Sequence, residues 1–447
     1  MRSADLLWPV AQELMDGIRR HRPRDCLSAS GAVQSWHRMT GRFAEGRFSA
    51  ISAQQGTATS ARYLLPHCLA HYAVSGLDPR VAAATRRESP GEAVAPGEQV
   101  TMPGWMDIPA VRSVLSGIDE AARGHDRLVA RVVIDFDLSE QDLVLAENAL
   151  ARQESRLLSY LTIRVIAQSG RRVATGLHTP GASDRLDSID PVSCGTEVAR
   201  RAVAGLDARP APVGHLPVVV AGGRGIVMLH EACCHPLEGD EVIRGSVYAG
   251  RIGERIASPL VTITDDPTRR GGVGSYACDD EGVPASPTTL IEAGVLTGYL
   301  TDRQSAALLG QASSGNGRCS TVLQPPQPRM SNTCLAGGPA GAGAIISSTR
   351  YGIYAQHVGG GEVVESTGEF TFRVTNGFMI ENGRITDPIA ETTISGTGTD
   401  VLMDIDAVAS DSSAGAAKCG KFGQWVPVGV VGPTLRVRSL LVGGTSQ

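Results

Sequence analysis

The chain has 447 residues, of which 42% are hydrophobic and 19% charged, the balance of a soluble globular protein with a large core. Its formal net charge of −5 offers no basic surface for nucleic acid, and no apolar run reaches the length of a membrane span. Nine irregularly spaced cysteines argue against a disulfide scaffold, and Asp5 and Glu13 interrupt any signal-peptide pattern, so we expect a cytoplasmic protein.

The first half of the chain predicts a mixture of helices and strands. Apolar residues at helical spacing predict helices over residues 4–20, 61–87, 108–123 and 197–206. Segments rich in β-branched residues predict strands over 128–136, 157–167 and 171–176. Residues 26–60 are polar and give no clear pattern, whereas repeated Pro and Gly over 88–104 indicate a long loop.

The helix expected over 61–87 carries His67 and His71 four residues apart. Two histidines at that spacing can share a metal ion, but no carboxylate completes a site and Cys68 lies off their common face. We therefore interpret this segment as a partly exposed helix surface.

The second half of the chain predicts mainly strands. Residues 208–217 are Pro-rich and indicate a connection between an N-terminal α+β domain, 1–207, and a β-rich domain, 208–447. A strong strand over 216–221 is followed by the turn Gly222-Gly223-Arg224-Gly225. Further strands are expected over 260–264, 290–300, 361–365, 370–374, 377–380, 385–388 and 434–442, and a short helix over 301–309. The fold class predicted is α+β.

The glycine turn at 222–225 permits a second interpretation. A G-G-x-G sequence after a strand can cradle phosphate at the start of a helix. No G-K-[ST] follows it and no ribose-binding acid is evident, so the motif alone does not predict a nucleotide site.

The sequence H-E-A-C-C-H at residues 230–235 indicates a hydrolytic metal site. Neutral imidazoles bind zinc, and an adjacent carboxylate can take a proton from zinc-bound water. The usual zincin spacing is H-E-x-x-H, whereas His230 and His235 are five residues apart, about 140° around an ideal helix. Both rings can face one metal only if the helix contains a π turn or ends between them, and Pro236 favours an end.

A catalytic zinc usually has three protein ligands, and the residues alone leave the third open. Cys234 lies four residues after His230 and therefore on the same helix face. Cys419 is flanked by Lys418 and Lys421, whose charge favours the metal-binding thiolate. A buried structural cysteine is the alternative interpretation of Cys419.

At this point the chain resembles the TldD/PmbA family of metallopeptidases. The resemblance is strong after residue 210, weak between 105 and 210, and absent from residues 1–104, which are divergent. The matching segments are residues 230–240, 279–282, 290–300, 329–333, 380–383, 419–428 and 433–444. Within the first of them, Cys233 and Cys234 replace apolar and small residues, and Pro236 replaces a small one.

The resemblance implies a zinc ion bound by His230, His235 and Cys419, with Glu231 as general base. It implies unstructured peptides as substrates, which pair with a sheet edge inside a chamber formed by two subunits. The partner would be a PmbA/TldE-type paralogue in a heterodimer, or a second copy of the chain. Glu238 and Asp240 either orient a histidine or are helix-end carboxylates, and Asn332 and the glycines near 420 are candidate oxyanion donors.

Two other functions fit the same residues. The divergent N-terminus and the cysteine pair are compatible with a tailoring amidohydrolase that acts on one small peptide-like substrate. A non-catalytic subunit with structural zinc is the third hypothesis. Whether Cys233 or Cys234 touches the metal is left open.

Overall fold

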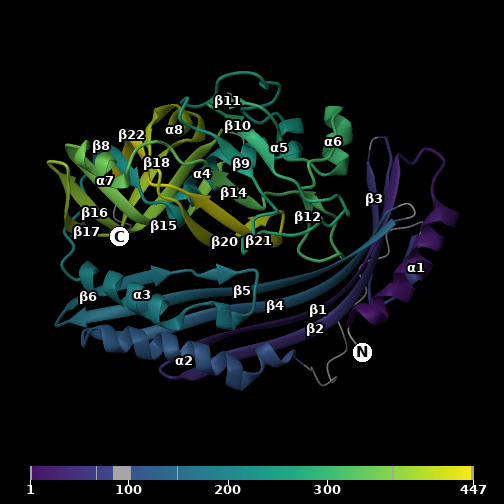
Figure 1. Cartoon of the computed structure of the whole chain (residues 1–447), viewed down its shortest axis with the longest axis horizontal. Coiled ribbons are helices and arrows are strands. Elements are labelled where there is room, and N and C mark those ends of the chain that lie inside the picture. Colours follow the sequence, from purple (N-terminus) through teal and green to yellow (C-terminus); the bar gives the residue numbers. More distant parts are fainter. Residues whose placement is uncertain (1–2, 67, 84–101, 148–149, 365–366, 444–447) are drawn as a thin grey trace.

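The computed structural model describes residues 3–66, 68–83, 102–147, 150–364 and 367–443. Figure 1 shows a long curved sheet that runs beneath a β-rich body, with helix α1 at one end of the sheet. The α+β class predicted from the sequence is confirmed. Among the described residues, no helix is both long and apolar enough to cross a membrane.

The long sheet has the strand order β3-β2-β1-β4-β5-β6, with β7 paired to β5. Its strands are β1 (Ser28–Ala44), β2 (Arg47–Leu64), β3 (Leu69–Ser75), β4 (Val129–Glu147), β5 (Leu150–Ser169), β6 (Arg172–His178) and β7 (Gly181–Ala182). Strands β1, β2, β4 and β5 are each at least 17 residues long, which gives the sheet its length.

The prediction of a helix over residues 61–87 is wrong. Residues 61–64 end β2, 69–75 form β3, and Pro79–Ala83 form a 3-10 turn. His71 pairs with Arg62 across β2 and β3, so cross-strand pairing overrides the local apolar spacing. The unassigned residues 26–60 supply β1 and most of β2. His67 and residues 84–101 of the expected loop lie outside the described residues.

The predicted N-terminal helices other than 61–87 are present. They are α1 (Ser3–His21), α2 (Ile108–His125) and α3 (Pro191–Gly205), and the last begins six residues earlier than expected. Asp190 caps α3 by accepting a hydrogen bond from Val192 N at 3.0 Å. α2 and α3 pack together on the long sheet through one apolar cluster, which includes Leu115 and Val198.

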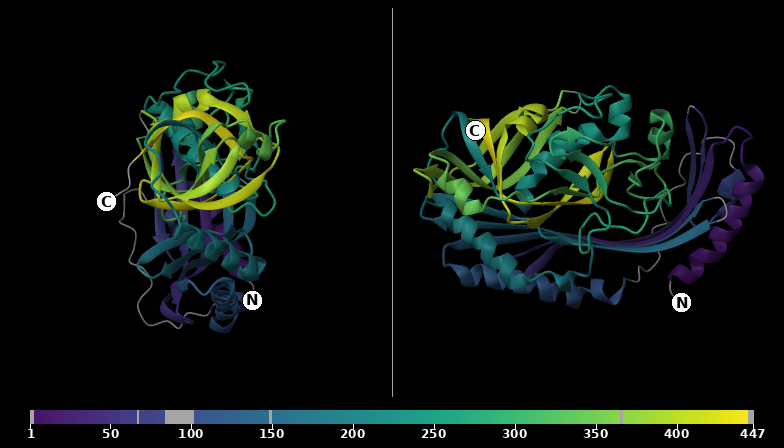
Figure 2. Two further views of the ribbon diagram at one scale, coloured as in Figure 1. Left: turned by 90° about the vertical axis from the view of Figure 1, so that its left-hand side faces the viewer. Right: turned by 45° about the horizontal axis from the view of Figure 1, so that its top comes forward.

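The C-terminal body contains a closed barrel. Strands β15-β8-β22-β18-β16 are hydrogen-bonded in this order, and an additional β15–β16 pairing closes the ring. The left view of Figure 2 looks into this barrel. The strands are β8 (Gly214–Val220), β15 (Tyr351–Val364), β16 (Glu369–Glu381), β18 (Thr392–Thr397) and β22 (Leu435–Gly443), with β17 (Arg384–Ile389) and β19 (Ile405–Val408) attached. Asn382 and Gly383, both with positive φ, turn β16 into β17 as the Asn-Gly pair predicts.

A six-stranded sheet beside the barrel carries Cys419, one of the candidate metal ligands. Its order is β11-β10-β9-β14-β21-β20, which leaves β20 at one edge. The strands are β9 (Ile263–Asp265), β10 (Thr288–Glu292), β11 (Val295–Leu296), β14 (Asn332–Leu335), β20 (Ser413–Lys421) and β21 (Gln424–Gly432). The short helix expected over 301–309 is α6 (Arg303–Leu309), capped by Asp302.

Candidate metal centre

The chain reaches the histidine motif through a tight turn after β8. A 3-10 turn (Gly223–Ile226) and the short α4 (Val227–Leu229) precede it. Glycine is needed in this turn because a Cβ at Gly222 would lie 2.4 Å from the Gly432 carbonyl oxygen, and one at Gly225 would lie 2.6 Å from Val220. The turn therefore packs directly against β21 and aims the following residues into the interior.

A π turn brings the two histidine rings together. Residues His230–Cys234 form it, and the His235 N–H donates to the His230 carbonyl five residues earlier. A 3-10 turn, His235–Leu237, follows at Pro236. The ring centroids of His230 and His235 lie 5.3 Å apart. Both solutions expected for the five-residue spacing, a π turn and a helix end, thus occur in succession.

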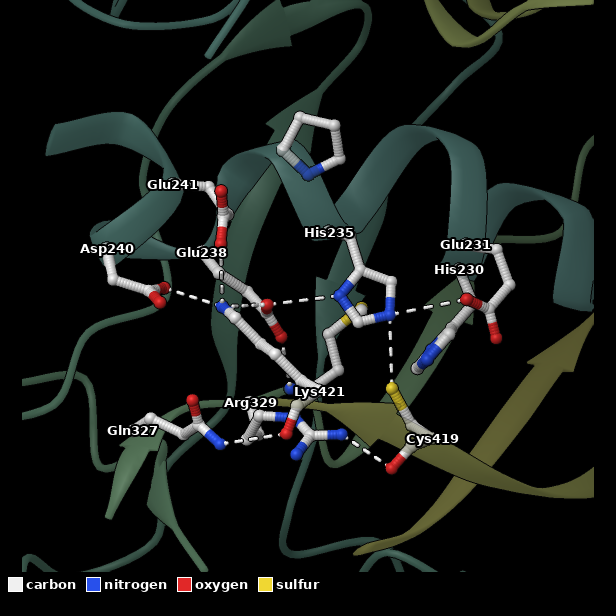
Figure 3. Close-up of polar contacts among 12 residues, drawn as sticks. His230, Glu231, His235, Glu238, Asp240, Glu241, Gln327, Arg329, Cys419 and Lys421 are labelled. Atoms are coloured by element: carbon white, nitrogen blue, oxygen red, sulfur yellow. Dashed lines mark hydrogen bonds and ion pairs between the residues drawn. The ribbon is translucent and has the colours of Figure 1, made fainter. Parts of the chain in front are cut away.

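Cys419 on β20 lies beside the two histidines, although it is 184 residues after His235 in the sequence. Its Sγ lies 3.1 Å from His235 Nε2, and the ligand atoms of His230, His235 and Cys419 all lie within 4.8 Å of one another. All three side chains are buried. Figure 3 shows the cysteine of β20 approaching the imidazole of His235 from below.

The neighbouring cysteines point elsewhere. Cys233 and Cys234 are fully buried in the apolar cluster of the C-terminal body and do not belong to this group of ligand atoms. Burial raises the pKa of both thiols, and nearby Asp265 adds to the rise at Cys234. Helix periodicity, which favoured Cys234 as a ligand, fails because the π turn rotates residue 235 into the position that residue 234 would occupy.

Glu231 lies beside the three ligand atoms. Its Oε2 is 3.3 Å from His235 Nε2, and 29% of its side chain is exposed. Burial opposes ionisation, but the hydrogen bond and charge of His235, followed by His230, lower the pKa of Glu231 to about 2. The carboxylate is therefore ionised at neutral pH and partly open to solvent.

The far nitrogens of both imidazoles are engaged. His230 Nδ1 lies 2.8 Å from Thr333 Oγ1, and His235 Nδ1 lies 3.0 Å from Glu238 Oε2. A proton on each Nδ1 makes these contacts hydrogen bonds and leaves each Nε2 with a lone pair for a metal. Of the two acids proposed to orient a histidine, Glu238 makes this contact, whereas Asp240 binds Lys421.

Lys421 anchors Glu238 from β20. Its Nζ lies 2.7 Å from Glu238 Oε2 and 2.7 Å from Asp240 Oδ1, and the side chain is 1% exposed. Burial disfavours a charged lysine, but Glu238 and then Asp240 outweigh it and raise the pKa of Lys421. Arg329 supports the same strand by donating to the Cys419 carbonyl oxygen at 2.6 Å.

Sequence reasoning named Lys421 only as a charge near Cys419 and assigned no role to Thr333 or Arg329. The two-residue period of a strand could have placed Lys421 on the same face as Cys419. The contacts of Thr333 and Arg329 arise from long-range packing, for which local spacing carries no signal.

The donor set fits a divalent cation. Burial opposes ionisation of Cys419, but His235, then His230 and Arg329, outweigh it and lower its pKa to about 5. Burial also disfavours a charged His235, yet the Cys419 thiolate and Glu238 raise its pKa well above the usual value. His230 Nε2 is buried without a hydrogen-bond partner among the described residues. The Cys419 thiolate, the Glu231 carboxylate and the unpaired Nε2 of His230 thus lie together, and they favour a positive charge between them.

Asn332 does not face this centre. Its Nδ2 donates to Asp266 O at 2.7 Å and to Ser275 Oγ at 3.0 Å, and its Oδ1 accepts from Gly274 N at 3.1 Å. These bonds hold the 266–275 loop and leave no amide hydrogen for a substrate. The expectation that Asn332 is an oxyanion donor is therefore wrong.

The sequence and the fold place the chain in a metallopeptidase family. Residues 213–444 match the model of the PmbA/TldA metallopeptidase C-terminal domain, and the chain belongs to this family. It is similar to the metalloprotease TldD homolog of Haemophilus influenzae, with 38% identity over 74% of this chain and 71% of that protein. A metalloprotease of Methanothermobacter thermautotrophicus is 37% identical over 76% of this chain and 75% of its own length. A third relative, from Saccharolobus solfataricus, is named a zinc metalloprotease TldD homolog and is 34% identical over 52% of each chain.

Solved structures share the fold over nearly the whole chain. A protein of Thermotoga maritima MSB8 superposes with a TM-score of 0.79 at 20% identity, covering 97% of this chain and 99% of its own. TldE of Thermococcus kodakarensis superposes with a TM-score of 0.74 at 18% identity, covering 97% of this chain and all of its own. The described part of the divergent first hundred residues therefore belongs to the shared fold, although its sequence does not reveal it.

Proposed function

We propose that the chain is a zinc-dependent peptidase in which His230, His235 and Cys419 hold the metal and Glu231 is the general base. The observation that carries this proposal is the convergence of three buried ligand atoms within 4.8 Å beside an ionised, partly exposed carboxylate. The names of the relatives support a metal-dependent protease, and the name of the Saccharolobus protein supports zinc.

The ligand chemistry favours zinc over harder cations. One thiolate and two imidazoles suit zinc, whereas magnesium and calcium prefer oxygen ligands. Three protein ligands are the number found at catalytic zinc sites, which keep one position for water. Bound there, zinc lowers the pKa of a water molecule and polarises a carbonyl group.

Glu231 carries the proton. Because its carboxylate is ionised, Oε2 accepts a proton from the attacking water and then delivers it to the leaving amine. Glu238 and Thr333 keep the Nδ1 proton on each imidazole, so that both rings stay in the metal-binding tautomer. Lys421 holds Glu238 in place for this purpose.

We propose unstructured peptides, or a peptide precursor, as the substrate. Cys419 lies on β20, which is an edge strand of its sheet among the described residues. An extended peptide can pair with such an edge through main-chain hydrogen bonds, which tolerate many sequences. A PmbA/TldE-type paralogue in a heterodimer, or a second copy of the chain, would complete the site, and the likeness to TldE supports this kind of partner.

One experiment separates the three candidate functions. The protein is purified alone and with a neighbouring paralogue, zinc per chain is measured, and cleavage of a panel of unstructured peptides is followed. One zinc per chain with broad cleavage supports the proposal. Cleavage of a single small substrate favours the tailoring amidohydrolase, and zinc without any cleavage favours the structural role.

A further inference from the structure

A cavity lies on the opposite side of the six-stranded sheet from the candidate metal centre. It has a volume of about 470 Å³ and is lined by residues of β6, α3, β15 and β20, by the glycine turn after β8 and by the 269–272 loop. In β14, Asn332 lines this cavity while its neighbour Thr333 contacts His230. In β20, Ala416 lines it while Cys419, three residues on, faces the ligand cluster.

The described residues that line this cavity are strongly cationic. They include four arginines and two histidines and no aspartate or glutamate: Arg201, Arg224, Arg269, Arg270, His178 and His357. Arg201 pairs with Glu197 at 2.9 Å. The other three arginines form no ion pair with a described carboxylate, so about three positive charges are left uncompensated there. Structural arginine clusters are normally balanced by acids, because unpaired like charges repel.

Buried polar atoms in this cavity lack partners. His357 is 2% exposed, and its Nδ1 is held by Thr375 Oγ1 at 2.8 Å. Its opposite nitrogen, Nε2, is buried and has no hydrogen-bond partner among the described residues, and the same is true of Arg224 Nε. A buried polar atom without a partner costs free energy unless a ligand or water satisfies it.

The two histidines of this cavity, His178 and His357, both have lowered pKa values. Burial lowers the pKa of His178 to about 4, with Arg201 adding to the fall. Burial lowers the pKa of His357 well below its usual value, and the positive charges of Arg201 and Arg224 add to this. Burial is the larger cause for both histidines, and the arginines add to it because they lie close enough to interact.

We propose that this cavity binds the phosphate group of a small phosphorylated molecule. Guanidinium groups donate paired hydrogen bonds to phosphate oxygens, and a dianion matches the excess charge better than a carboxylate does. The cavity is several times larger than a phosphate ion, so part of it is left for the group that carries the phosphate.

The glycine turn has a defined part in this site. A Cβ at Gly223 would lie 2.8 Å from Ser413 Oγ, and one at Gly415 would lie 2.8 Å from Arg224 N. The glycines thus allow the turn to pack on β20, where Arg224 donates to the Ala416 carbonyl and is held at the cavity. The G-G-R-G sequence therefore contributes the Arg224 side chain to the proposed phosphate site, and not a helix N-terminus.

The test is titration calorimetry on the purified full-length protein with inorganic phosphate and with ribose 5-phosphate, and with ribose and acetate for comparison. We expect both phosphates to bind, and ribose and acetate to bind at least tenfold more weakly. Arg224→Ala and Arg270→Ala should each weaken phosphate binding about tenfold or more, the usual cost of a charge-assisted hydrogen bond. Arg270 is exposed and forms no ion pair with a described residue, so its variant should fold normally.

Arg255→Ala is the matched control. Arg255 also donates to a main-chain carbonyl, that of Ala293, but it does not line the cavity, so phosphate binding should not change. Cys419→Ser separates this site from the metal centre, where phosphate could bind zinc, and it should leave phosphate affinity unchanged. Equal weakening by Arg255→Ala, loss of binding in Cys419→Ser, equal binding of acetate, or exclusion of ribose 5-phosphate would each overturn the proposal. Peptidase activity enters none of these measurements, so the outcome is independent of the proposed function.

Discussion

Lys418 and Lys421 point to opposite faces of β20, and each forms an ion pair with a different part of the molecule. Lys421 is 1% exposed and binds Glu238, which contacts the His235 imidazole. Lys418 is 24% exposed and binds Asp137 on β4 of the long sheet. They are the only lysines in the chain. One thus supports the metal centre, whereas the other joins the two layers of the fold.

Replacing Lys421 by methionine should damage both the fold and the metal centre. The change leaves Glu238 buried without its cation, and breaking a buried pair costs about 3–5 kcal/mol of unfolding free energy. Zinc affinity should fall about 10- to 100-fold, because the contact that orients His235 is weakened. Lys418→Met is the control, since Asp137 keeps Arg38 at 2.6 Å, and it should cost only about 1 kcal/mol with zinc affinity unchanged. Urea unfolding and a chelator competition measure the two effects, and equal zinc affinity in the two variants would contradict this role of Lys421.

Exchanging single cysteines should identify the third ligand. Cys419→Ser should lower zinc affinity more than about 100-fold, because a lost ligand costs more than a lost supporting contact. Cys234→Ser should keep one zinc per chain, since that side chain lies outside the group of ligand atoms. Metal analysis after dialysis against a weak chelator distinguishes the two, and the reverse pattern would restore Cys234 as the ligand.

Glu231→Gln should separate metal binding from catalysis. The amide cannot accept a proton, so peptide cleavage should fall about 10²- to 10⁴-fold, the usual contribution of a general base. The change leaves His230, His235 and Cys419 in place, so zinc content should be unchanged. Glu292→Gln, at an exposed position of β10, controls for loss of a surface carboxylate. Full activity in Glu231→Gln with zinc bound would remove Glu231 from the mechanism.

The elements around the candidate metal centre were largely predictable, because local signals determine them. The strand before the glycine turn, the need for either a π turn or a helix end, and the place of Pro236 all follow from spacing and backbone preferences. Local signals offered Cys419 only as one candidate beside Cys234, since β14 and β21 pair in parallel and bring β20 to the motif through long-range contacts. Only the family resemblance selected it over Cys234.

The long sheet shows where local reasoning fails. Residues 28–64 are rich in small and polar side chains without a clear period, so their strands are specified by pairing with one another and with β4. Apolar residues between 61 and 87 mimic helical spacing, yet β3 forms at the sheet edge against β2. Both errors reflect tertiary pairing that overrides weak local preference.

The logarithm of the zinc affinity should rise with pH with one slope below about pH 5 and a shallower slope above it. Cys419, with its pKa lowered to about 5, is a thiolate at neutral pH, whereas His235, with its pKa raised, holds a proton that zinc must displace. Affinity should therefore rise about tenfold per pH unit between pH 5 and the raised pKa of His235. Below about pH 5 a second proton competes at Cys419, and the slope should approach about a hundredfold per unit. Competition against a chelator of known pH dependence measures both limbs, and a single slope through pH 5 would show that Cys419 is not the low-pKa ligand.

Arg156 should be a main link between the long sheet and the C-terminal body. From β5 it reaches Asp280 Oδ1 at 2.5 Å and the Cys278 carbonyl oxygen at 2.8 Å, so the acidic segment at residues 279–282 contributes to the interface between the layers. Arg156→Met leaves Asp280 buried and without this partner, and should lower the free energy of unfolding by about 3–5 kcal/mol. Arg152→Met, at an exposed position of the same strand, should change it by no more than about 0.5 kcal/mol. Urea unfolding followed by tryptophan fluorescence compares the two variants, and equal midpoints would show that other contacts hold the layers together.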